Sequence, residues 1–326
     1  MDLLAIFHLV NWIKTMARIT SGLQTAAILL ALSLPSAAGV VADVRGAIAR
    51  NEFKAASGML AGYRAQHGVN SEYLEALSWM GRGELAAGDL KQAYSFGEQT
   101  RELALPLVKN GKLDQNPQLA IALGAAYEVQ AQSLSKENQT EKAVLLLRSA
   151  LKTYGNTSIR ARLQKNLNLL TFLGKPAPAL ISQEYLGTKP AALANLKGSV
   201  VLLFFWAHWC GDCKADAPII AQVQSEFAQQ GFVVVAPTQR YGYIGAQEDV
   251  PAQQETQYIE SVWQRYYSQL GGDAVPISKE NFDLYGASTT PTIVLLARNG
   301  NVALYHPGAI SYGDLRPEIE KLLKSH

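Results

Sequence analysis

The chain has 326 residues, of which 48% are hydrophobic and 17% are charged, and its formal net charge is +2. This composition excludes a disordered chain, and the length suggests two domains. Lysine and arginine do not cluster, so nucleic acid is a poor candidate for a partner. The only two cysteines, Cys210 and Cys213, can form neither a multi-disulfide scaffold nor a four-thiolate zinc site within one chain.

Residues 1–38 have the pattern of a signal peptide or leader. Lys14 and Arg18 precede an apolar run over residues 22–34, and small residues follow at 36–38, where a signal peptidase cleaves. The apolar run is shorter than the ~20 residues that a membrane-spanning helix needs. We therefore expect cleavage and no stable membrane span afterwards, and an uncleaved membrane tether is the alternative.

The leader predicts export to the periplasm or another extracytoplasmic compartment, where disulfides persist. The part before Met16 contains Asp2, His8 and Trp12 and makes the leader long, so translation can start at Met1 or at Met16. The two starts predict leaders of different length and the same mature chain.

Residues 41–172 carry apolar side chains at helical spacings. Residues 41–66 predict a helical pair with a break, and a second pair turns at Gly88-Asp89. A third pair turns over residues 135–140, and a last helix over 159–170 caps the array. We expect this stretch to form an α-helical domain.

The second helical pair resembles a tetratricopeptide repeat. Gly81, Gly88 and Ala93 occupy the positions of its small residues, whereas Glu84 and Gly97 stand where the pattern has larger side chains. Stacked repeats of this kind bury a shared face. Two interpretations stay open for this domain, a protein-binding surface and a helical spacer or dimerisation domain.

A domain boundary is predicted at Gly174, where Pro176 and Pro178 prevent a helix from continuing. Beyond it, continuous apolar runs indicate strands that are covered on both faces. These runs lie at 200–206, 232–236 and 293–297; Asn299-Gly300 then predicts a hairpin to 302–305, and a helix follows over 314–324. We expect residues 174–326 to form an α/β domain with a mixed sheet.

Cys210 and Cys213 lie between the strand at 200–206 and a predicted helix at 214–229. A helix N-terminus offers unpaired N–H groups and a positive dipole end, which stabilise the reactive thiolate of Cys210. Cys210 is then expected to attack a substrate disulfide, and Cys213 to resolve the mixed disulfide. This chemistry needs no cofactor beyond the cysteine pair. A copper site from both thiols and one histidine is the alternative.

Residues 205–218 read Phe-Trp-Ala-His-Trp-Cys-Gly-Asp-Cys-Lys-Ala-Asp-Ala-Pro, and residues 288–292 read Ser-Thr-Thr-Pro-Thr. From residue 174 onward the chain resembles the thioredoxin superfamily, in particular the exported TlpA/ResA/DsbE-type thiol–disulfide oxidoreductases. The resemblance implies protein disulfides or dithiols as substrates and a further thiol as electron donor.

The resemblance also implies roles for single residues. Pro291 is expected in cis in the loop that faces the disulfide, so that Thr290 offers main-chain groups to a substrate. Trp209 is expected to contact the substrate as well. Asp216 occupies the place of an acid that tunes cysteine reactivity in the ResA-like branch, and an exposed carboxylate in an early helical turn is the alternative.

Two residues depart from the thioredoxin pattern. Phe204 stands where thioredoxin has a buried aspartate, so the proton relay must be absent or carried by another group such as Asp216. Asp212 places a negative charge beside the thiols, which disfavours the thiolate and predicts a reducing protein. For His208 we expect a surface residue beside the site; tuning of the thiolate by its partial positive charge is the alternative.

An insertion over residues 240–273 separates the second and third strands of the expected sheet. Residues 253–270 predict a helix rich in aromatic side chains. We expect most of these aromatic residues to pack internally, and an aromatic lid or partner surface is the alternative.

The sequence as a whole predicts an exported thiol–disulfide oxidoreductase, acting as a reductase, behind an N-terminal helical domain that can bind a protein partner. Two alternatives stay open. One is a scaffold or chaperone with an accessory thioredoxin fold, and the other is a thiol peroxidase.

Overall fold

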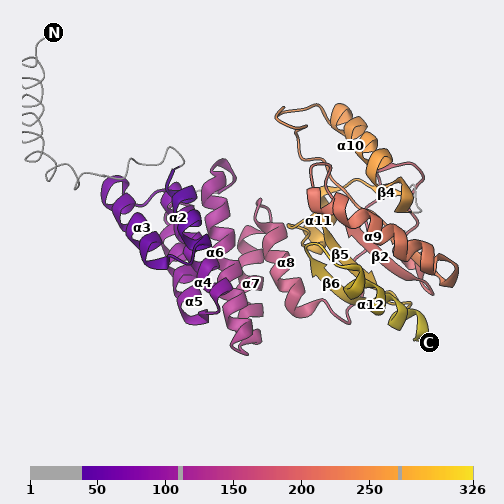
Figure 1. Ribbon diagram of the computed structural model, residues 1–326, viewed down its shortest axis with the longest axis horizontal. Coiled ribbons are helices and arrows are strands. Elements are labelled where there is room, and N and C mark those ends of the chain that lie inside the picture. Colours follow the sequence, from indigo (N-terminus) through magenta and orange to yellow (C-terminus); the bar gives the residue numbers. More distant parts are fainter. Residues whose placement is uncertain (1–38, 109–112, 271–273, 326) are drawn as a thin grey trace, which may run out of the picture.

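The computed structural model describes residues 39–108, 113–270 and 274–325, and the predicted leader lies outside them. In the described residues, the chain is helical from Gly39 to Thr171 and forms an α/β unit beyond Thr171 (Figure 1). This order of an α-helical part and a mixed-sheet part confirms the predicted fold class. No helix in the described ranges is long and apolar enough to cross a membrane.

Seven α-helices follow one another in the described residues of the helical part. Side chains at the N-caps begin three of them, since Asn70, Asp89 and Asn116 each accept a hydrogen bond from a backbone N–H three residues later. The helices are α2 (Gly39–Ala49), α3 (Phe53–His67), α4 (Ser71–Ala87), α5 (Leu90–Ala104), α6 (Pro117–Lys136), α7 (Thr140–Tyr154) and α8 (Arg160–Thr171).

The predicted helical pairs are present, with one turn shorter than expected. Only residues 137–139 separate α6 from α7, because the helix of Pro117 continues to Lys136. Glycines allow close packing between neighbouring helices: a Cβ atom at Gly97 of α5 would lie 2.9 Å from the Gln130 side chain and 3.1 Å from the Ala126 carbonyl oxygen of α6. The departure from the repeat pattern at Gly97 thus has a packing reason.

The main sheet has the strand order β3-β2-β5-β6. The central strand β2 (Val200–Phe205) is buried along its whole length and pairs in parallel with β3 (Phe232–Val235). On its other side, β2 pairs antiparallel with β5 (Thr292–Leu296). β5 in turn pairs antiparallel with β6 (Val302–Pro307). A second sheet, not predicted from the sequence, joins the two-residue strands β1 (Tyr185–Leu186) and β4 (Val275–Pro276).

Alternate side chains of β2 enter different cores, as the two-residue period of a strand requires. Leu202 and Phe204 belong to the core that includes residues of α9 (Gly211–Phe227), α10 (Ala252–Tyr266) and α12 (Tyr312–Lys324). Leu203 and Phe205 belong to the opposite core, with residues of α11 (Lys279–Tyr285).

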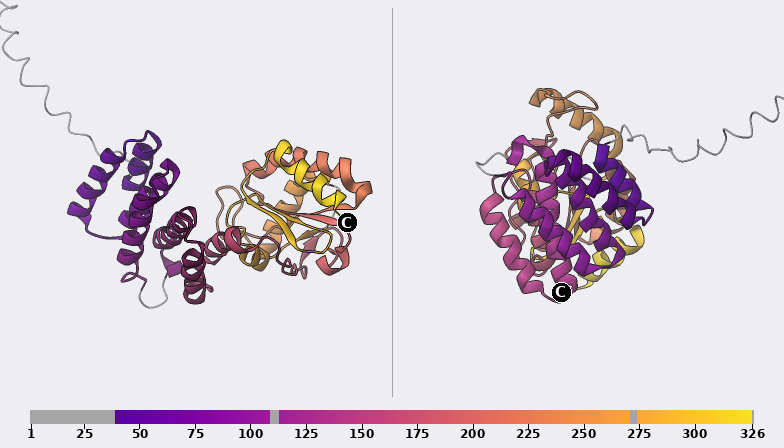
Figure 2. Two further views of the ribbon diagram at one scale, coloured as in Figure 1. Left: turned by 90° about the horizontal axis from the view of Figure 1, so that it is seen from below. Right: turned by 90° about the vertical axis from the view of Figure 1, so that its left-hand side faces the viewer.

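Helix α8 lies between the helical array and the α/β unit (Figure 2). Its Asn168 Nδ2 donates a buried hydrogen bond of 2.9 Å to the carbonyl oxygen of Tyr285, at the end of α11. Gly286 follows with a positive φ of 63°, and a Cβ atom there would lie 2.3 Å from the Lys165 backbone nitrogen. Phe172, directly after α8, is buried in the same core as Phe205. Helix α8, which was expected to cap the helical array, therefore also packs against the α/β unit.

Candidate functional site

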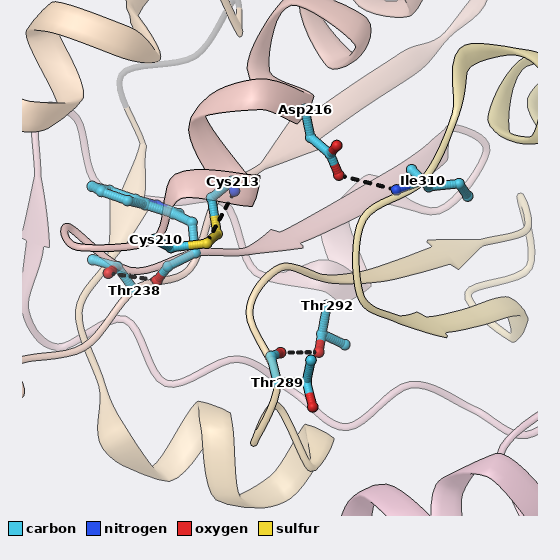
Figure 3. The surroundings of a disulfide bond; sticks show 8 residues. Cys210, Cys213, Asp216, Thr238, Thr289, Thr292 and Ile310 are labelled. Carbon is cyan, nitrogen blue, oxygen red and sulfur yellow. Dashed lines mark hydrogen bonds between the residues drawn. A yellow bond between two sulfur atoms is a disulfide. The ribbon is translucent and has the colours of Figure 1, made fainter. Parts of the chain in front are cut away.

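Cys210 and Cys213 form a disulfide at the N-terminus of α9 (Figure 3). Cys210 is the N-cap residue, and its Sγ accepts a hydrogen bond of 3.0 Å from the Cys213 backbone N–H. Their Cα atoms are 5.3 Å apart, and both residues are buried. Cys210 therefore occupies the helix end where N–H groups and the dipole favour negative charge on sulfur.

The loop before β5 lies at the same end of the sheet as the disulfide. Thr292 pairs with Phe205 in the β2–β5 register, so residues just before Thr292 lie near those just after Phe205. The Thr290–Pro291 peptide bond is cis, as expected. Thr292 Oγ1 donates a hydrogen bond of 2.6 Å to the Thr289 carbonyl oxygen and so closes the loop (Figure 3).

Asp216 lies one helical turn after Cys213 and is buried, with 4% of its surface exposed, so the alternative of an exposed carboxylate is wrong. Burial raises the pKa of Asp216, and the hydrogen bond that its Oδ2 accepts from the Ile310 N–H at 3.1 Å opposes this shift. The nearby Asp212 carboxylate raises the pKa further. A buried carboxyl group with a raised pKa keeps its proton to a higher pH than an exposed one. Such a group suits proton exchange with the nearby thiols.

His208 is not the surface residue that we expected. Its side chain is 1% exposed, and Nε2 lies 3.2 Å from Oε1 of Glu255, whose side chain is equally buried. Burial lowers the pKa of His208, and the hydrogen bond to Glu255 opposes this shift. The prediction failed because the partner belongs to α10, 47 residues away in the sequence.

Glu255 is a site residue that the sequence did not reveal. Besides His208, its carboxylate accepts hydrogen bonds from the backbone N–H groups of Tyr241 at 2.5 Å and Gly242 at 2.8 Å. The rings of Tyr241, Tyr243 and Tyr258 lie edge-on to the imidazole, at centroid distances of 5.4 to 5.6 Å. The insertion is thus fastened to the segment that leads into Cys210.

Buried hydrogen bonds also fix the loop between β2 and the disulfide. Trp206 Nε1 donates to the Ala236 carbonyl oxygen at 3.0 Å, and Thr238 Oγ1 donates to the Trp206 carbonyl oxygen at 2.9 Å. Phe204 is buried next to Tyr267, with ring centroids 6.0 Å apart. The place of the thioredoxin aspartate is therefore apolar.

The aromatic side chains of residues 253–270 divide into two groups. Trp263 and Tyr267 are buried and contact the Trp206 ring, which confirms the packing interpretation for them. Tyr258 and Tyr266 are partly exposed, at 37% and 38%. Trp209, next to Cys210, is 48% exposed and offers an open apolar surface beside the disulfide.

Within the part of the chain that the structure describes, no three His, Cys, Asp or Glu residues gather into a group that could hold a metal ion.

Residues 189–323 match the sequence pattern of the thioredoxin-like domain family. The thiol-disulfide oxidoreductase ResA of Oceanobacillus iheyensis is 34% identical over 76 residues, which are 22% of this chain and 39% of that protein. ResA of Bacillus subtilis is 38% identical over 63 residues, 19% of this chain and 35% of that protein. The similarity thus spans less than half the length of these two relatives.

A longer alignment joins the chain to ResA of Geobacillus thermodenitrificans, at 23% identity over 46% of this chain and 78% of that protein. Among solved structures, a candidate thiol:disulfide interchange protein DsbE from Chlorobium tepidum is 29% identical over 46% of this chain and 97% of its own, with a TM-score of 0.36. The family match over residues 189–323 identifies the α/β part of the chain as a thioredoxin-like domain, which follows the described region of α-helices.

Proposed function

We propose that the protein is a thiol–disulfide oxidoreductase that exchanges the Cys210–Cys213 pair with protein substrates. The observation that carries the proposal is the disulfide at the N-terminus of α9, at the sheet end that also holds the cis Thr290–Pro291 bond. The relatives named thiol-disulfide oxidoreductase support the same activity.

In the reducing direction, the Cys210 thiolate attacks one sulfur of a substrate disulfide. A bond forms between Cys210 and that sulfur, and the second substrate sulfur leaves as a thiolate. Cys213 then loses its proton and attacks Cys210, which releases the first substrate sulfur and restores the Cys210–Cys213 disulfide. Two electrons pass to the substrate, and a separate thiol donor must reduce the pair again.

We propose that Asp216 accepts the proton of Cys213 during resolution, since it lies one turn further along α9 and its pKa is raised by burial. Thr290 and Trp209 flank the site and are proposed to contact the substrate. Phe204 offers no proton acceptor, so the relay rests on Asp216.

We propose reduction outside the cytoplasm as the physiological role. The leader pattern of residues 1–38 supports export, and the Asp212 charge in the first turn of α9 supports a stable disulfide. We also propose residues 41–172 as a helical domain with tetratricopeptide-like pairs that can bind a partner, and residues 174–326 as the catalytic domain.

Replacement of Cys213 by serine tests the activity. The variant should accumulate mixed disulfides through Cys210 with proteins of the exported fraction, and the wild type should reduce insulin disulfides. A Cys210→Ser, Cys213→Ser double variant is the control and should trap nothing. Absence of both trapping and insulin reduction would instead favour a helical scaffold with an accessory thioredoxin fold.

A further inference from the structure

A cleft of about 390 Å³ lies between the helical region and the thioredoxin-like domain, beside the disulfide. On the domain side it is lined by Trp209, which precedes Cys210, and by Thr290, which precedes the cis proline. A substrate sulfur bonded to Cys210 would therefore place its neighbouring residues at the mouth of this cleft. Cys210 is itself only 2% exposed, so the surrounding surface must recognise the substrate.

The opposite wall of the cleft belongs to the helical region. It is formed by the first turns of α6 and α8, with Ile121, Ile159 and Ala161 among the lining residues. On the domain side, Phe282 and Ala287 also line the cleft, with only 1% and 4% of their surfaces exposed. Most of the surface that lines the cleft is apolar, although the uncharged polar side chains of Ser158, Gln239 and Ser288 also line it.

The charged groups of the cleft are already paired within the protein. Lys279 Nζ lies 2.7 Å from Asp283 Oδ2, and Arg162 Nε lies 3.6 Å from Glu128 Oε2. A charged occupant would have to compete with these partners and lose its hydration, whereas an apolar occupant would not.

The helical wall is held at a fixed distance from the disulfide. The Asn168–Tyr285 hydrogen bond and the contact of Gly286 with the Lys165 backbone fasten α8 to the end of α11. The same segment, through Ala287, leads directly into the Thr290–Pro291 loop. The width of the cleft is therefore set by packed backbone and not by a flexible linker.

We propose that α6 and α8 complete the substrate site of the oxidoreductase, and that the cleft takes an extended, apolar, uncharged segment next to the reactive cysteine of a protein substrate. This inference rests on the proposed function. It assigns the helical region a direct part in choosing substrates, in addition to any separate partner that it binds.

Two peptides with one cysteine each provide the test, one with Leu, Val and Ala around the cysteine and one with Ser and Gln. In each peptide the cysteine carries thionitrobenzoate in a mixed disulfide. Cys210 of the reduced protein attacks the peptide sulfur, and thionitrobenzoate leaves as a coloured thiolate with the electron pair of the broken bond. Cys213 then releases the peptide thiol and re-forms the disulfide.

The wild type should react about tenfold faster with the apolar peptide, a typical discrimination for an apolar pocket. Ile121→Asp puts a carboxylate on the helical wall and should reduce this ratio several-fold. The ratio is measured on one protein sample, so it does not depend on the folded fraction. Leu145→Asp, at a 66% exposed leucine of α7 outside the cleft, is the matched control and should keep the ratio.

Ser158→Trp, at an exposed cleft residue just before α8, is a second variant and should also lower the ratio. Equal rates for both peptides in the wild type, or an unchanged ratio in both cleft variants, would overturn the proposal. If the wild type still reduces glutathione disulfide when the cleft proposal fails, the proposed oxidoreductase function is retained. Failure to react with glutathione disulfide and with both peptides would overturn both.

Discussion

His208 Nε2 lies 3.2 Å from Glu255 Oε1, and both side chains are only 1% exposed. This contact joins the segment that leads into Cys210 to the first turn of α10 in the insertion. The site thus has a second support besides the sheet, because the carboxylate that contacts His208 also holds the backbone of Tyr241 and Gly242.

Glu255→Ala should lower the free energy of unfolding by about 3–5 kcal/mol, because it leaves two buried backbone N–H groups and His208 without their acceptor. Urea unfolding of the oxidised protein measures the change. Glu260→Ala, at an exposed position of the same helix, should change the value by less than about 0.5 kcal/mol. Equal effects of both substitutions would contradict a supporting role for Glu255.

The free energy of unfolding should fall as the pH drops below 6.5. Burial lowers the pKa of His208 from its ordinary value of 6.5 in the folded protein. The unfolded chain therefore takes up the proton first, so this contribution is complete above pH 6.5 and is lost progressively below it, by at most about 1.4 kcal/mol per pH unit.

His208→Gln should flatten this pH dependence, measured by urea unfolding at several pH values between 5 and 8. His67→Gln changes an exposed histidine of α3 and should leave the slope as it is in the wild type. A slope that persists in the His208 variant would assign the pH dependence to other groups.

Asp216→Asn should raise the free energy of unfolding at neutral pH. Burial raises the pKa of Asp216 above its ordinary value of 3.8, so the folded protein holds this proton more tightly than the unfolded chain. The stabilisation is complete below pH 3.8 and is lost as the pH rises through the folded pKa. The asparagine does not ionise, and it can still accept the hydrogen bond from Ile310.

The same variant should resolve mixed disulfides more slowly, since it removes the proposed proton acceptor. Stopped-flow measurement of the second exchange step, over a range of pH, checks this expectation. An unchanged rate and pH profile would limit Asp216 to a structural role.

Gly286→Ala should destabilise the packing of α8 on the domain by about 2–4 kcal/mol. The added Cβ would lie 2.3 Å from the Lys165 backbone nitrogen, in addition to the strain of a positive φ. Gly245→Ala is the control, because Gly245 has a similar φ of 60° and no heavy atom within 4 Å of the added Cβ. Urea unfolding of the two variants separates the packing cost from the backbone strain.

The sequence predicts the strands and the cysteine pair well because local pattern specifies them. β2 is buried on both faces, so its run of apolar residues is continuous, and Asn299-Gly300 marks the turn into β6. β1 and β4 have two residues each, which is too short for any periodicity.

The environments of His208 and Asp216 could not be predicted in the same way. Glu255 lies 47 residues after His208 in the sequence. Asp216 accepts a hydrogen bond from the backbone N–H of Ile310, which lies 94 residues after it. Both contacts depend on how the insertion and the segment before α12 fold back onto α9, which no local pattern specifies. The resemblance to a family led to Pro291, whereas the insertion that holds Glu255 has no place in the pattern of that family.

The position of Phe172 has a consequence for how the chain can be divided. Its ring packs edge-on against Tyr285 and Tyr305 inside the thioredoxin-like domain, although it follows the last helix of the helical region. A shortened chain that begins at Gly174 would lose this ring and leave an apolar hollow open to water, at a cost of about 3–5 kcal/mol. A cut between α7 and α8 would instead keep α8 and Phe172 on the catalytic half, but it would uncover Ile159 and Leu163, which are buried in the core of the helical region.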